Sequence, residues 1–445
     1  MSIGGRLTPL ERLFALEQFG IKLGLDNIRA ILAALGNPER AYRSIHIGGT
    51  NGKGSVAAMV ERGLRAAGLK TGRYTSPHLD RIEERVAIDG QMVDRATFEA
   101  VIAEVFEVID RSLSRRSPGE GGLSVQPTFF EVSTAVAFEI FKRAAVDVAI
   151  VEVGLGGRFD ATNVLTPTIA AITTIAFDHE RHLGNTLDRI AFEKAGIAKP
   201  GVPLVIGRLP SEAAARILQV AREVGAPIFD AHATATDRRH PELNLALAGR
   251  HQHENAAVAV SILERWSTLV SHVSSEAIVT GLTECEWPAR LEWLRVPFDS
   301  RSDRVATEQL ARDRPQFGEL LIDAAHNPAG AAALASYLQD TGAEKMPIVL
   351  AAMADKDAGG MIAALAPVAS AFIATTVPNA RARSADQLAG EIRRQAPSLP
   401  VESIASPDEA VARALEHSRR AVACGSIYMI GPLRSRLLAS GATRL

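Results

Sequence analysis

The chain has 445 residues, which is too long for one compact core, so we expect two or three domains. Hydrophobic residues make up 47% of the chain and charged residues 22%, as in ordinary globular proteins, which argues against a disordered or fibrous protein. The formal net charge of −2 gives no electrostatic reason to expect binding to nucleic acid or to an anionic membrane surface.

Targeting signals and membrane spans are not expected either. Glu11 and Glu17 interrupt the apolar residues near the start, unlike in a signal peptide, and no apolar run is long enough to cross a bilayer. Cys285 and Cys424 are too few and too far apart for a disulfide framework or a zinc cluster, so we expect two reduced thiols. These features predict a cytoplasmic protein.

In chain order, the first half alternates between helical and strand-like segments. Apolar residues at helical spacing predict two amphipathic helices over 8–35, and a third helix over 128–145. The run 146–151 is rich in β-branched residues, which is typical of a parallel strand buried on both faces. Such alternation predicts an α/β fold with a parallel sheet. Further strands are expected at 70–75, 169–175 and 202–206.

A second alternation begins near Leu320 and has the size of a small doubly wound domain. Its strands are expected at 320–323, 348–350, 372–374 and 427–430. We place the domain boundary near 284–288. Two polar inserts, 112–122 and 296–315, lack clear periodicity and are predicted to be surface loops.

The stretch 46–55 combines a short strand, a glycine-rich turn and a helix start. This geometry directs backbone N–H groups and the positive end of a helix at phosphate. Lys53 is placed to bridge two phosphate groups, and Ser55 could offer its hydroxyl to phosphate or Mg²⁺. The usual Walker pattern is not met, because Ile47 takes its first glycine position and Gly54 separates Lys53 from Ser55. The pattern alone leaves phosphate binding and an ordinary glycine turn equally open.

Polar residues also follow two later strands. Glu152 lies at the carboxyl end of a buried strand, before a glycine-rich run, where a carboxylate is well placed to hold Mg²⁺ against phosphates; the alternative is a carboxylate that merely ends a strand. His179 follows the next strand and could ligate a metal or act as an acid or base, against an ordinary surface or core histidine. Lys194 by itself would be a solvated helix lysine.

Eleven short blocks lie along the chain in a fixed order. They cover 49–55, 75–79, 129–131, 152–163, 178–179, 193–201, 251–256, 287–292, 323–328, 354–357 and 425–428. Together they resemble the folylpolyglutamate synthase/dihydrofolate synthase family, which belongs to the Mur-type ATP-dependent amide ligases. The resemblance extends over nearly the whole chain, apart from the two polar inserts. The run Glu-Val-Gly-Leu-Gly-Gly-Arg from Glu152 is highly specific, whereas Ser-Pro-His-Leu from Ser76 is weak.

The resemblance implies a P-loop ATPase-type parallel-sheet domain over 1–286 that binds ATP, followed by a smaller Rossmann-like glutamate-binding domain over 287–445. Asn255 would face the adenine, Arg290 would reach the phosphates, and Asp323 would contact the ribose. The implied nucleotide-binding residues are Thr50, Asn51, Gly52, Lys53, Gly54, Ser55, Asn255, Arg290 and Asp323.

The same resemblance implies a metal-assisted reaction. Ser76, Glu152 and His179 would bind Mg²⁺ ions that bridge the phosphates and the substrate carboxylate, with K⁺ or another monovalent cation as an optional further cofactor. Lys194 would be carbamylated by CO₂, which turns a cation into an anionic oxygen ligand near the second metal. The implied catalytic residues are Lys53, Glu152, His179 and Lys194.

Substrate contacts are implied on both domains. Phe130 and Asp160 would contact the pterin, since a flat heteroaromatic ring needs a stacking face and a hydrogen-bond partner, and Thr128 is compatible with the same site. The implied glutamate-binding residues are His326, Ser426 and Lys356. The expected partners are ATP, L-glutamate, dihydropteroate and folates, bound by a monomer.

Three departures from the family pattern stand out. Ala289 and Ala324 replace glycines that the family commonly has, which affects local backbone geometry. The 296–315 insert separates Arg290 from Asp323 by more than usual.

The predicted activity is the joining of L-glutamate to dihydropteroate, to folates or to both, and we favour both. A dedicated polyglutamylating enzyme is the first alternative. A ligase acting on a UDP-linked cell-wall precursor is a second; only about 45 residues precede the P-loop, too few for a uridine-nucleotide domain. A nucleotide-dependent switch that hydrolyses ATP without ligation is a third, and glutamate-dependent phosphate release would distinguish it.

Overall fold

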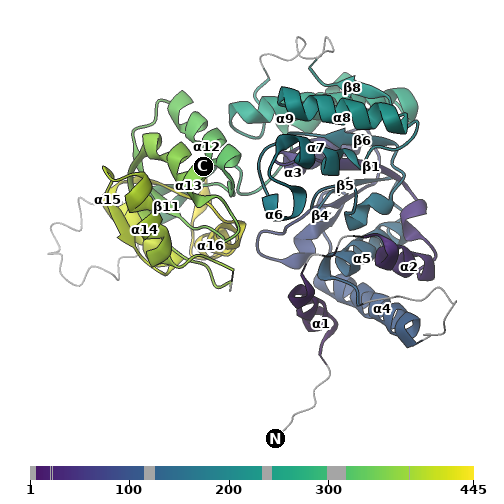
Figure 1. Ribbon diagram of the computed structural model, residues 1–445, viewed down its shortest axis with the longest axis horizontal. Coiled ribbons are helices and arrows are strands. Elements are labelled where there is room, and N and C mark those ends of the chain that lie inside the picture. The colour runs from purple at the N-terminus through teal and green to yellow at the C-terminus, as the bar shows by residue number, and fades with distance from the viewer. Residues whose placement is uncertain are drawn as a thin grey trace, which may run out of the picture. The chain divides into compact units, whose positions relative to one another are not determined.

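A computed structural model of the chain describes residues 7–20, 22, 24–114, 126–232, 243–297, 317–379 and 381–445. These residues form two compact units (Figure 1). Unit 1 consists of Met1–Ala176, Glu180–Ala246 and Gln252–Glu286, and unit 2 of Phe177–His179, Leu247–His251 and Trp287–Leu445. The two polar inserts that were expected to be loops, 112–122 and 296–315, lie mostly outside the described residues. At their described ends, Ser112–Ser114 finish a helix, and Val296 and Pro297 finish a strand.

Unit 1 is built on an eight-stranded sheet. Its strands are β1 Arg43–Gly48, β2 Thr71–Tyr74, β3 Val86–Ile88, β4 Gln91–Met92, β5 Val148–Glu152, β6 Ile169–Ile172, β7 Leu204–Ile206 and β8 Ile228–Asp230. They lie in the order β4-β3-β2-β5-β1-β6-β7-β8. The parallel sheet expected from the sequence is confirmed for β2, β5, β1, β6, β7 and β8. Strands β3 and β4 add an antiparallel edge that was not predicted.

Helices cover both faces of this sheet (Figure 1). They are α1 Pro9–Ala15, α2 Asp26–Ala34, α3 Lys53–Ala66, α4 Arg95–Ser114, α5 Phe129–Arg143, α6 Glu180–Leu183, α7 Leu187–Ala195, α8 Ser211–Val224, α9 Arg250–Leu269 and α10 Ser275–Thr283. One core joins α1, α2, α4 and α5 to β2 and β5, and another joins α7 and α8 to β6 and β7. Because β5 is buried along its whole length, its apolar run shows no alternation in the sequence.

Unit 2 contains a seven-stranded sheet in the order β13-β12-β11-β14-β10-β9-β15. Its strands are β9 Glu292–Pro297, β10 Phe317–Ile322, β11 Met346–Leu350, β12 Ala369–Ala374, β13 Val401–Ser403, β14 Arg420–Cys424 and β15 Thr443–Arg444. The strands from β13 to β10 are parallel, and β9 and β15 complete an antiparallel edge.

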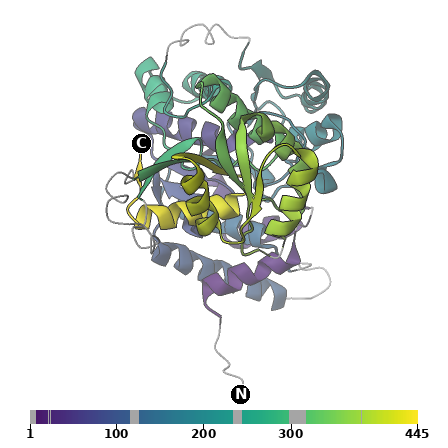
Figure 2. The same ribbon diagram turned by 90° about the vertical axis from the view of Figure 1, so that its left-hand side faces the viewer.

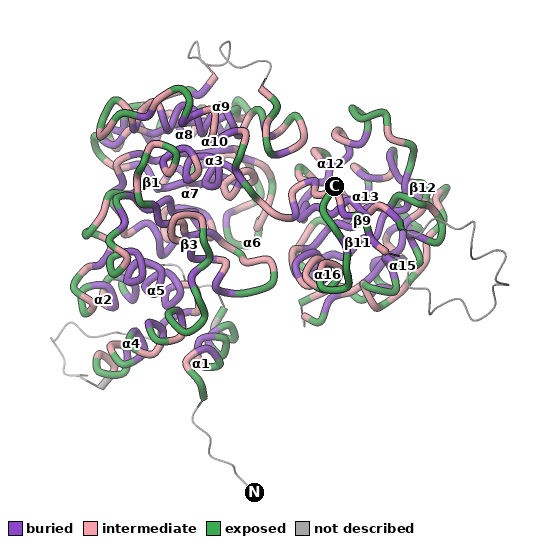
Figure 3. Tube along the Cα trace, turned by 180° about the vertical axis from the view of Figure 1, so that it is seen from behind, coloured by how far each residue is buried: buried purple, intermediate pink, exposed green. Residues whose placement is uncertain are grey.

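The helices of unit 2 are α12 Pro328–Asp340, α13 Ala358–Leu365, α14 Ala385–Gln395, α15 Pro407–His417 and α16 Ile427–Ala439. Helices α12, α13 and α14 share one apolar core with the sheet. Figure 2 shows the strands of this unit, green to yellow, flanked by its helices, and Figure 3 shows that the strands are largely buried. No helix within the described ranges has both the length and the apolarity needed to cross a membrane.

One predicted strand is wrong. Residues 427–430, expected to be a strand, form the first turn of α16, and the strand of this βα unit is β14, at Arg420–Cys424. Short apolar runs cannot be assigned to helix or strand by periodicity alone. Here Gly425, with φ 103°, makes the turn after β14 and leaves Ser426 at the start of the helix.

Candidate active site

The phosphate loop links the end of β1 to the start of α3, as predicted. Two of its positions require glycine. A Cβ at Gly49, where φ is 136°, would lie 2.0 Å from Oγ1 of Thr173, and a Cβ at Gly52, where φ is 87°, would lie 2.2 Å from Oδ1 of Asn255. The N–H of Asn51 donates to the hydroxyl of Thr174, 3.1 Å away. The segment after β6 thus holds the loop in place. The first N–H groups of a helix have no acceptor within the helix, so those of α3 can bind an anion.

Three predicted residues meet at the carboxyl ends of β2, β5 and β1. The ammonium of Lys53 donates to the carbonyl oxygen of Thr50 at 2.9 Å and lies 3.8 Å from Oε1 of Glu152. The N–H of Ser76 donates to Oε2 of Glu152 at 3.2 Å. Adjacent parallel strands end at the same edge of a sheet, which explains why residues 53, 76 and 152 come together.

The hydroxyl of Ser76 is the least satisfied atom of this group. Its Oγ is buried and has no hydrogen-bond partner among the described residues. Buried hydroxyls almost always have a partner, and hydroxyl and carboxylate oxygens are the ligands that Mg²⁺ prefers. Ser76 and Glu152 therefore fit a divalent cation.

Lys194 is not a solvated helix lysine. It lies in α7, 5% exposed, and its ammonium donates to the carbonyl oxygen of Gly49 at 2.8 Å. The glycine-rich run after β5 packs on the same helix, since a Cβ at Gly157 would lie 2.8 Å from the carbonyl oxygens of Glu193 and Lys194. The phosphate loop and the run 154–157 are thus both in contact with the end of α7.

The residues predicted to contact a pterin are also engaged in local structure. Thr128 caps α5, exchanging hydrogen bonds with Glu131. Asp160 accepts hydrogen bonds from the N–H groups of Leu155 and Thr162, and its burial raises its pKa. The ring of Phe130 packs against the backbone of Gly154, just after β5. The contact is so close that a Cβ at Gly154 would lie 2.4 Å from Cζ of Phe130.

Sequence reasoning missed several residues that position this group. Gln252, in α9, accepts a hydrogen bond from Asn255 at 2.9 Å and lies 3.4 Å from Oγ of Ser55. Thr173 and Thr174 directly follow β6 and bind the main chain of Asn51. Their position at a strand end was a usable signal, because it is the rule that singled out Glu152.

His46, in β1, was also missed. It is fully buried, its Nε2 lies 2.8 Å from Oγ1 of Thr162, and Thr162 donates its hydroxyl to Asp160. Burial, assisted by the charge of Lys199, lowers the pKa of His46 to about 3. A neutral histidine therefore lies beneath the Asp160 loop.

Unit 2 carries the remaining predicted nucleotide residues. The carboxylate of Asp323 accepts hydrogen bonds from the N–H groups of Leu291, at 2.9 Å, and Ala325, at 2.8 Å. The guanidinium of Arg290 donates to the carbonyl oxygen of Ala289 at 3.3 Å. Arg290 and Asp323 also act on the pKa of His251, which burial lowers. These residues surround the turn where Ala289 replaces the expected glycine.

A second cluster in unit 2 centres on Asp178. Lys356 donates to Oδ1 of Asp178 at 2.5 Å, Asn327 donates to Oδ2 at 3.2 Å, and Nε2 of His326 lies 3.6 Å from Oδ2. Although burial opposes it, the hydrogen bond from His326 and the charge of Lys356 hold the pKa of Asp178 far below its usual range. Nε2 of His179 lies 3.1 Å from the ammonium of Lys356.

Ser426 completes the predicted glutamate-binding set. It is 1% exposed, and its Oγ is buried without a hydrogen-bond partner in the described part of the chain. The N–H of Gly425 donates to the carbonyl oxygen of Ala325 at 2.8 Å, so the turn that carries Ser426 is joined to the turn that carries His326. A buried hydroxyl of this kind can serve a bound polar ligand.

The predicted metal ligands are divided between the units. Ser76 and Glu152 belong to unit 1, and His179 belongs to the short segment Phe177–His179 of unit 2. Within the described residues, no three His, Cys, Asp or Glu side chains are grouped so that they could hold a metal ion by themselves. The assignment of His179 as a metal ligand stays a prediction.

Comparisons with known proteins agree with this arrangement. Residues 309–425 match the family model "Mur ligase, glutamate ligase domain". The dihydrofolate synthase/folylpolyglutamate synthase of Bacillus subtilis is 32% identical, over 94% of this chain and 96% of that protein. A Mycobacterium tuberculosis folylpolyglutamate synthase, solved with ADP and AMPPCP, superposes with a TM-score of 0.81 at 32% identity, over 97% of this chain and 98% of that chain.

A third comparison adds a metal and an amino acid. A bifunctional folylpolyglutamate synthase/dihydrofolate synthase, solved with Mn, AMPPNP and L-glutamate, superposes with a TM-score of 0.77 at 29% identity, over 97% of this chain and 98% of that chain. A phosphate-loop unit followed by a unit that matches the glutamate ligase domain defines an ATP-dependent ligase of the Mur type. More narrowly, the chain belongs to the dihydrofolate synthase/folylpolyglutamate synthase family.

Proposed function

We propose that the protein uses ATP to join L-glutamate both to dihydropteroate and to folates, which makes it a bifunctional enzyme. The observation that carries the proposal is that Lys53 and Glu152 meet beside a glycine-rich helix start, next to a Ser76 hydroxyl that has no hydrogen-bond partner among the described residues. The B. subtilis relative, whose name includes both activities, supports the bifunctional assignment.

The chemistry follows from the substrates. A carboxylate does not condense with an amine in water, because its oxygen is a poor leaving group. Transfer of the γ-phosphoryl group of ATP to the carboxylate forms an acyl phosphate and ADP. The amine of glutamate then attacks the carbonyl carbon, the C–O bond to phosphate breaks, and inorganic phosphate leaves as the amide forms. Catalysis mainly requires positioning and neutralisation of negative charge.

Within unit 1, Lys53 would neutralise charge on the transferring phosphoryl group, and the N–H groups at the start of α3 would bind the phosphates. Thr50, Asn51, Gly54 and Ser55 line this turn. Ser76 and Glu152 would hold Mg²⁺, which supplies charge neutralisation for the phosphates and the substrate carboxylate when bound. We retain His179 as a further ligand, and K⁺ or another monovalent cation as an optional cofactor.

Lys194 would be carbamylated. An ammonium against a metal-binding loop repels a cation, whereas a carbamate on the same nitrogen carries anionic oxygens. The burial of Lys194 and its 2.8 Å contact with Gly49 support a role at the phosphate loop.

The remaining assignments follow the two units. Asn255 would contact the adenine, and Arg290 and Asp323 the phosphates and ribose. Phe130 would stack on the pterin, with Thr128 and Asp160 beside it. His326, Ser426 and Lys356 would bind L-glutamate. The buried Oγ of Ser426, which has no hydrogen-bond partner in the described ranges, supports this part of the assignment. We propose that the protein acts as a monomer on these small molecules, in the cytoplasm.

The second candidate is an enzyme that only lengthens polyglutamate chains, since a relative from Lacticaseibacillus casei is named folylpolyglutamate synthase alone. Mass spectrometry of products distinguishes the two. Dihydropteroate and tetrahydrofolate are each incubated with ATP, Mg²⁺ and L-glutamate. We expect glutamate to be added to both. Addition to tetrahydrofolate alone would support the second candidate, and phosphate release that does not depend on glutamate would remove the ligase assignment.

A further inference from the structure

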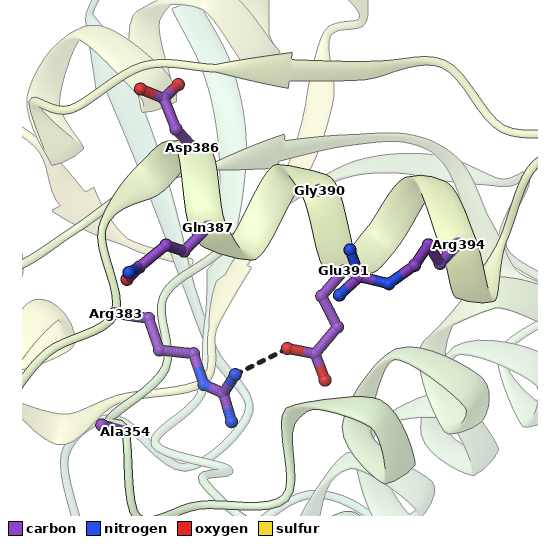
Figure 4. A pocket seen from close by; sticks show the side chains of 7 residues that line it. All are labelled: Ala354, Arg383, Asp386, Gln387, Gly390, Glu391 and Arg394. Atoms are coloured by element: carbon purple, nitrogen blue, oxygen red, sulfur yellow. Dashed lines mark hydrogen bonds and ion pairs between the residues drawn. The ribbon is translucent and has the colours of Figure 1, made fainter.

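A pocket of about 540 Å³ lies on unit 2, along one side of α14 (Figure 4). Arg383, Glu391 and Arg394 contribute charged side chains to its lining, and Ala354 lines it from the neighbouring loop. The pocket is thus adjacent to the loop 351–357, which carries Lys356 of the Asp178 cluster.

Arg383 connects α14 to this loop. One arm of its guanidinium, Nη1, donates to Oε2 of Glu391 at 2.7 Å, and the other arm, Nη2, donates to the carbonyl oxygen of Lys356 at 3.2 Å. Its own N–H donates to the carbonyl oxygen of Ala352 at 3.0 Å. The side chains of Arg383 and Glu391 are 27% and 17% exposed, so the pair is partly shielded from water.

The other side of Lys356 faces the cluster. While the main-chain oxygen of Lys356 accepts from Arg383, its ammonium contacts Asp178 at 2.5 Å and His179 at 3.1 Å. The same residue is therefore held at its backbone from one side and at its side chain from the other. A shift of the loop would move the ammonium away from Asp178.

We propose that Arg383 is a positioning residue for glutamate binding, which acts through Lys356 and does not touch the substrate; the proposal rests on the assignment of Lys356 to the glutamate site. The planar guanidinium suits this task, because its two arms donate in fixed directions at once. Glu391 holds one arm, and the second arm fixes the loop.

Arg394 provides a matched control. It lines the same pocket and carries the same charge, but it makes no hydrogen bond or ion pair with the part of the chain that the structure describes. In Figure 4 the dashed line joins Arg383 to Glu391, and none reaches Arg394.

The test measures glutamate-dependent phosphate release by the full-length enzyme, with ATP, folate and L-glutamate varied in turn. Arg383→Gln should raise the KM for L-glutamate about tenfold, as expected for the loss of a hydrogen bond from a charged group. The KM for ATP should stay near that of the parent enzyme. Arg383→Lys should show a smaller rise, because an ammonium can pair with Glu391 without the fixed second arm. Arg394→Gln should match the parent enzyme.

A double-variant cycle tests whether Arg383 acts through Lys356. In a Lys356→Met background, Arg383→Gln should have almost no further effect on the KM for L-glutamate, because the group that it positions is already missing. Additive effects of the two changes would overturn the proposal. The proposal would also be overturned if Arg383→Gln raised all three KM values and lowered kcat by similar factors, which indicates general damage to unit 2. A rise in the KM for L-glutamate caused by Arg394→Gln would overturn it too, because it indicates that the pocket itself binds the substrate.

Failure of the proposed function gives a different result. If the parent enzyme releases phosphate without L-glutamate, the ligase assignment itself is wrong. A parent enzyme that requires L-glutamate, together with an Arg383→Gln variant that has an unchanged KM, overturns only the positioning role.

Discussion

The ammonium of Lys194 donates a 2.8 Å hydrogen bond to the carbonyl oxygen of Gly49, a residue 145 positions earlier in the chain. This bond joins the end of α7 to the first glycine of the phosphate loop. A buried lysine at such a position either carries a charge next to the site for the nucleotide or has that charge removed chemically. The predictions below begin with this contact.

Replacement of Lys194 by alanine should lower kcat about a thousandfold, on the scale of losing one group that stabilises transition-state charge. If the working form is a carbamate, formate or another short carboxylate should restore part of the activity by supplying the missing oxygens. ¹³C NMR with ¹³CO₂ should show a carbamate signal in the parent enzyme only. An active alanine variant, or a loss that no carboxylate relieves, contradicts this role. Lys70→Ala, at an exposed site, is the control.

Lys53→Ala should abolish most of the glutamate-dependent phosphate release, with a loss of about 100-fold or more in kcat/KM for ATP. Its ammonium lies 3.8 Å from Oε1 of Glu152 and 2.9 Å from the carbonyl oxygen of Thr50 in the loop. Steady-state kinetics with varied ATP gives the measurement. A variant that retains its affinity for ATP and its kcat would show that the phosphates bind elsewhere.

Gly52→Ala should weaken nucleotide binding as well as stability. Its Cβ would meet Oδ1 of Asn255 at 2.2 Å, and its φ of 87° is strained for any residue with a side chain. Gly68→Ala separates the two effects, because Gly68 has a φ of 85° but no atom within 4 Å. Both variants should lose about 1–2 kcal/mol of unfolding free energy, and only Gly52→Ala should also raise the dissociation constant for ATP. Equal ATP binding by the two variants would argue against a loop shaped by this contact.

Ser76→Ala should raise the Mg²⁺ concentration needed for half-maximal activity while changing the unfolding free energy very little. The reason is that Oγ of Ser76 makes no hydrogen bond with the described residues, so its removal breaks none of these protein contacts. Activity titrated with Mg²⁺ after removal of metal by EDTA provides the measurement. A lower melting temperature with an unchanged Mg²⁺ requirement would assign the hydroxyl a structural role.

Stability should fall in mild acid because of His46. Its pKa of about 3 in the folded protein lies below the value near 6.5 in the unfolded chain. The unfolded state therefore binds more protons, and this contribution to stability is present above pH 6.5 and lost as the pH falls from 6.5 towards 3. At pH 5.5 the loss from this residue should be about 1.4 kcal/mol.

Urea unfolding at pH 7.5 and 5.5 measures this effect. His46→Gln should show a smaller loss of stability between the two values than the parent protein, because the glutamine side chain does not titrate. The same substitution at the exposed His272 controls for the change of residue type. An identical pH dependence in His46→Gln and the parent protein would contradict the prediction.

Much of the site was predictable because its signals are local. Glycines at the turn after β1, and a carboxylate at the end of β5, indicated where Lys53 and Glu152 would gather, since parallel strands end at a common edge. Ser76 was expected from the family resemblance alone. The assignment of 427–430 to a strand failed, because four apolar residues fit a helix start as well as a strand.

By itself, the sequence determined the order of βα units, the glycine-rich turn after β1 and the family to which the blocks belong, because apolar spacing, turn residues and motifs depend on near neighbours. Only the tertiary structure decided that Lys194 is buried against Gly49 and that Lys356 is held between Asp178 and Arg383. Such contacts join residues that are far apart in the chain. They depend on how the helices pack on their sheets, which no local pattern specifies.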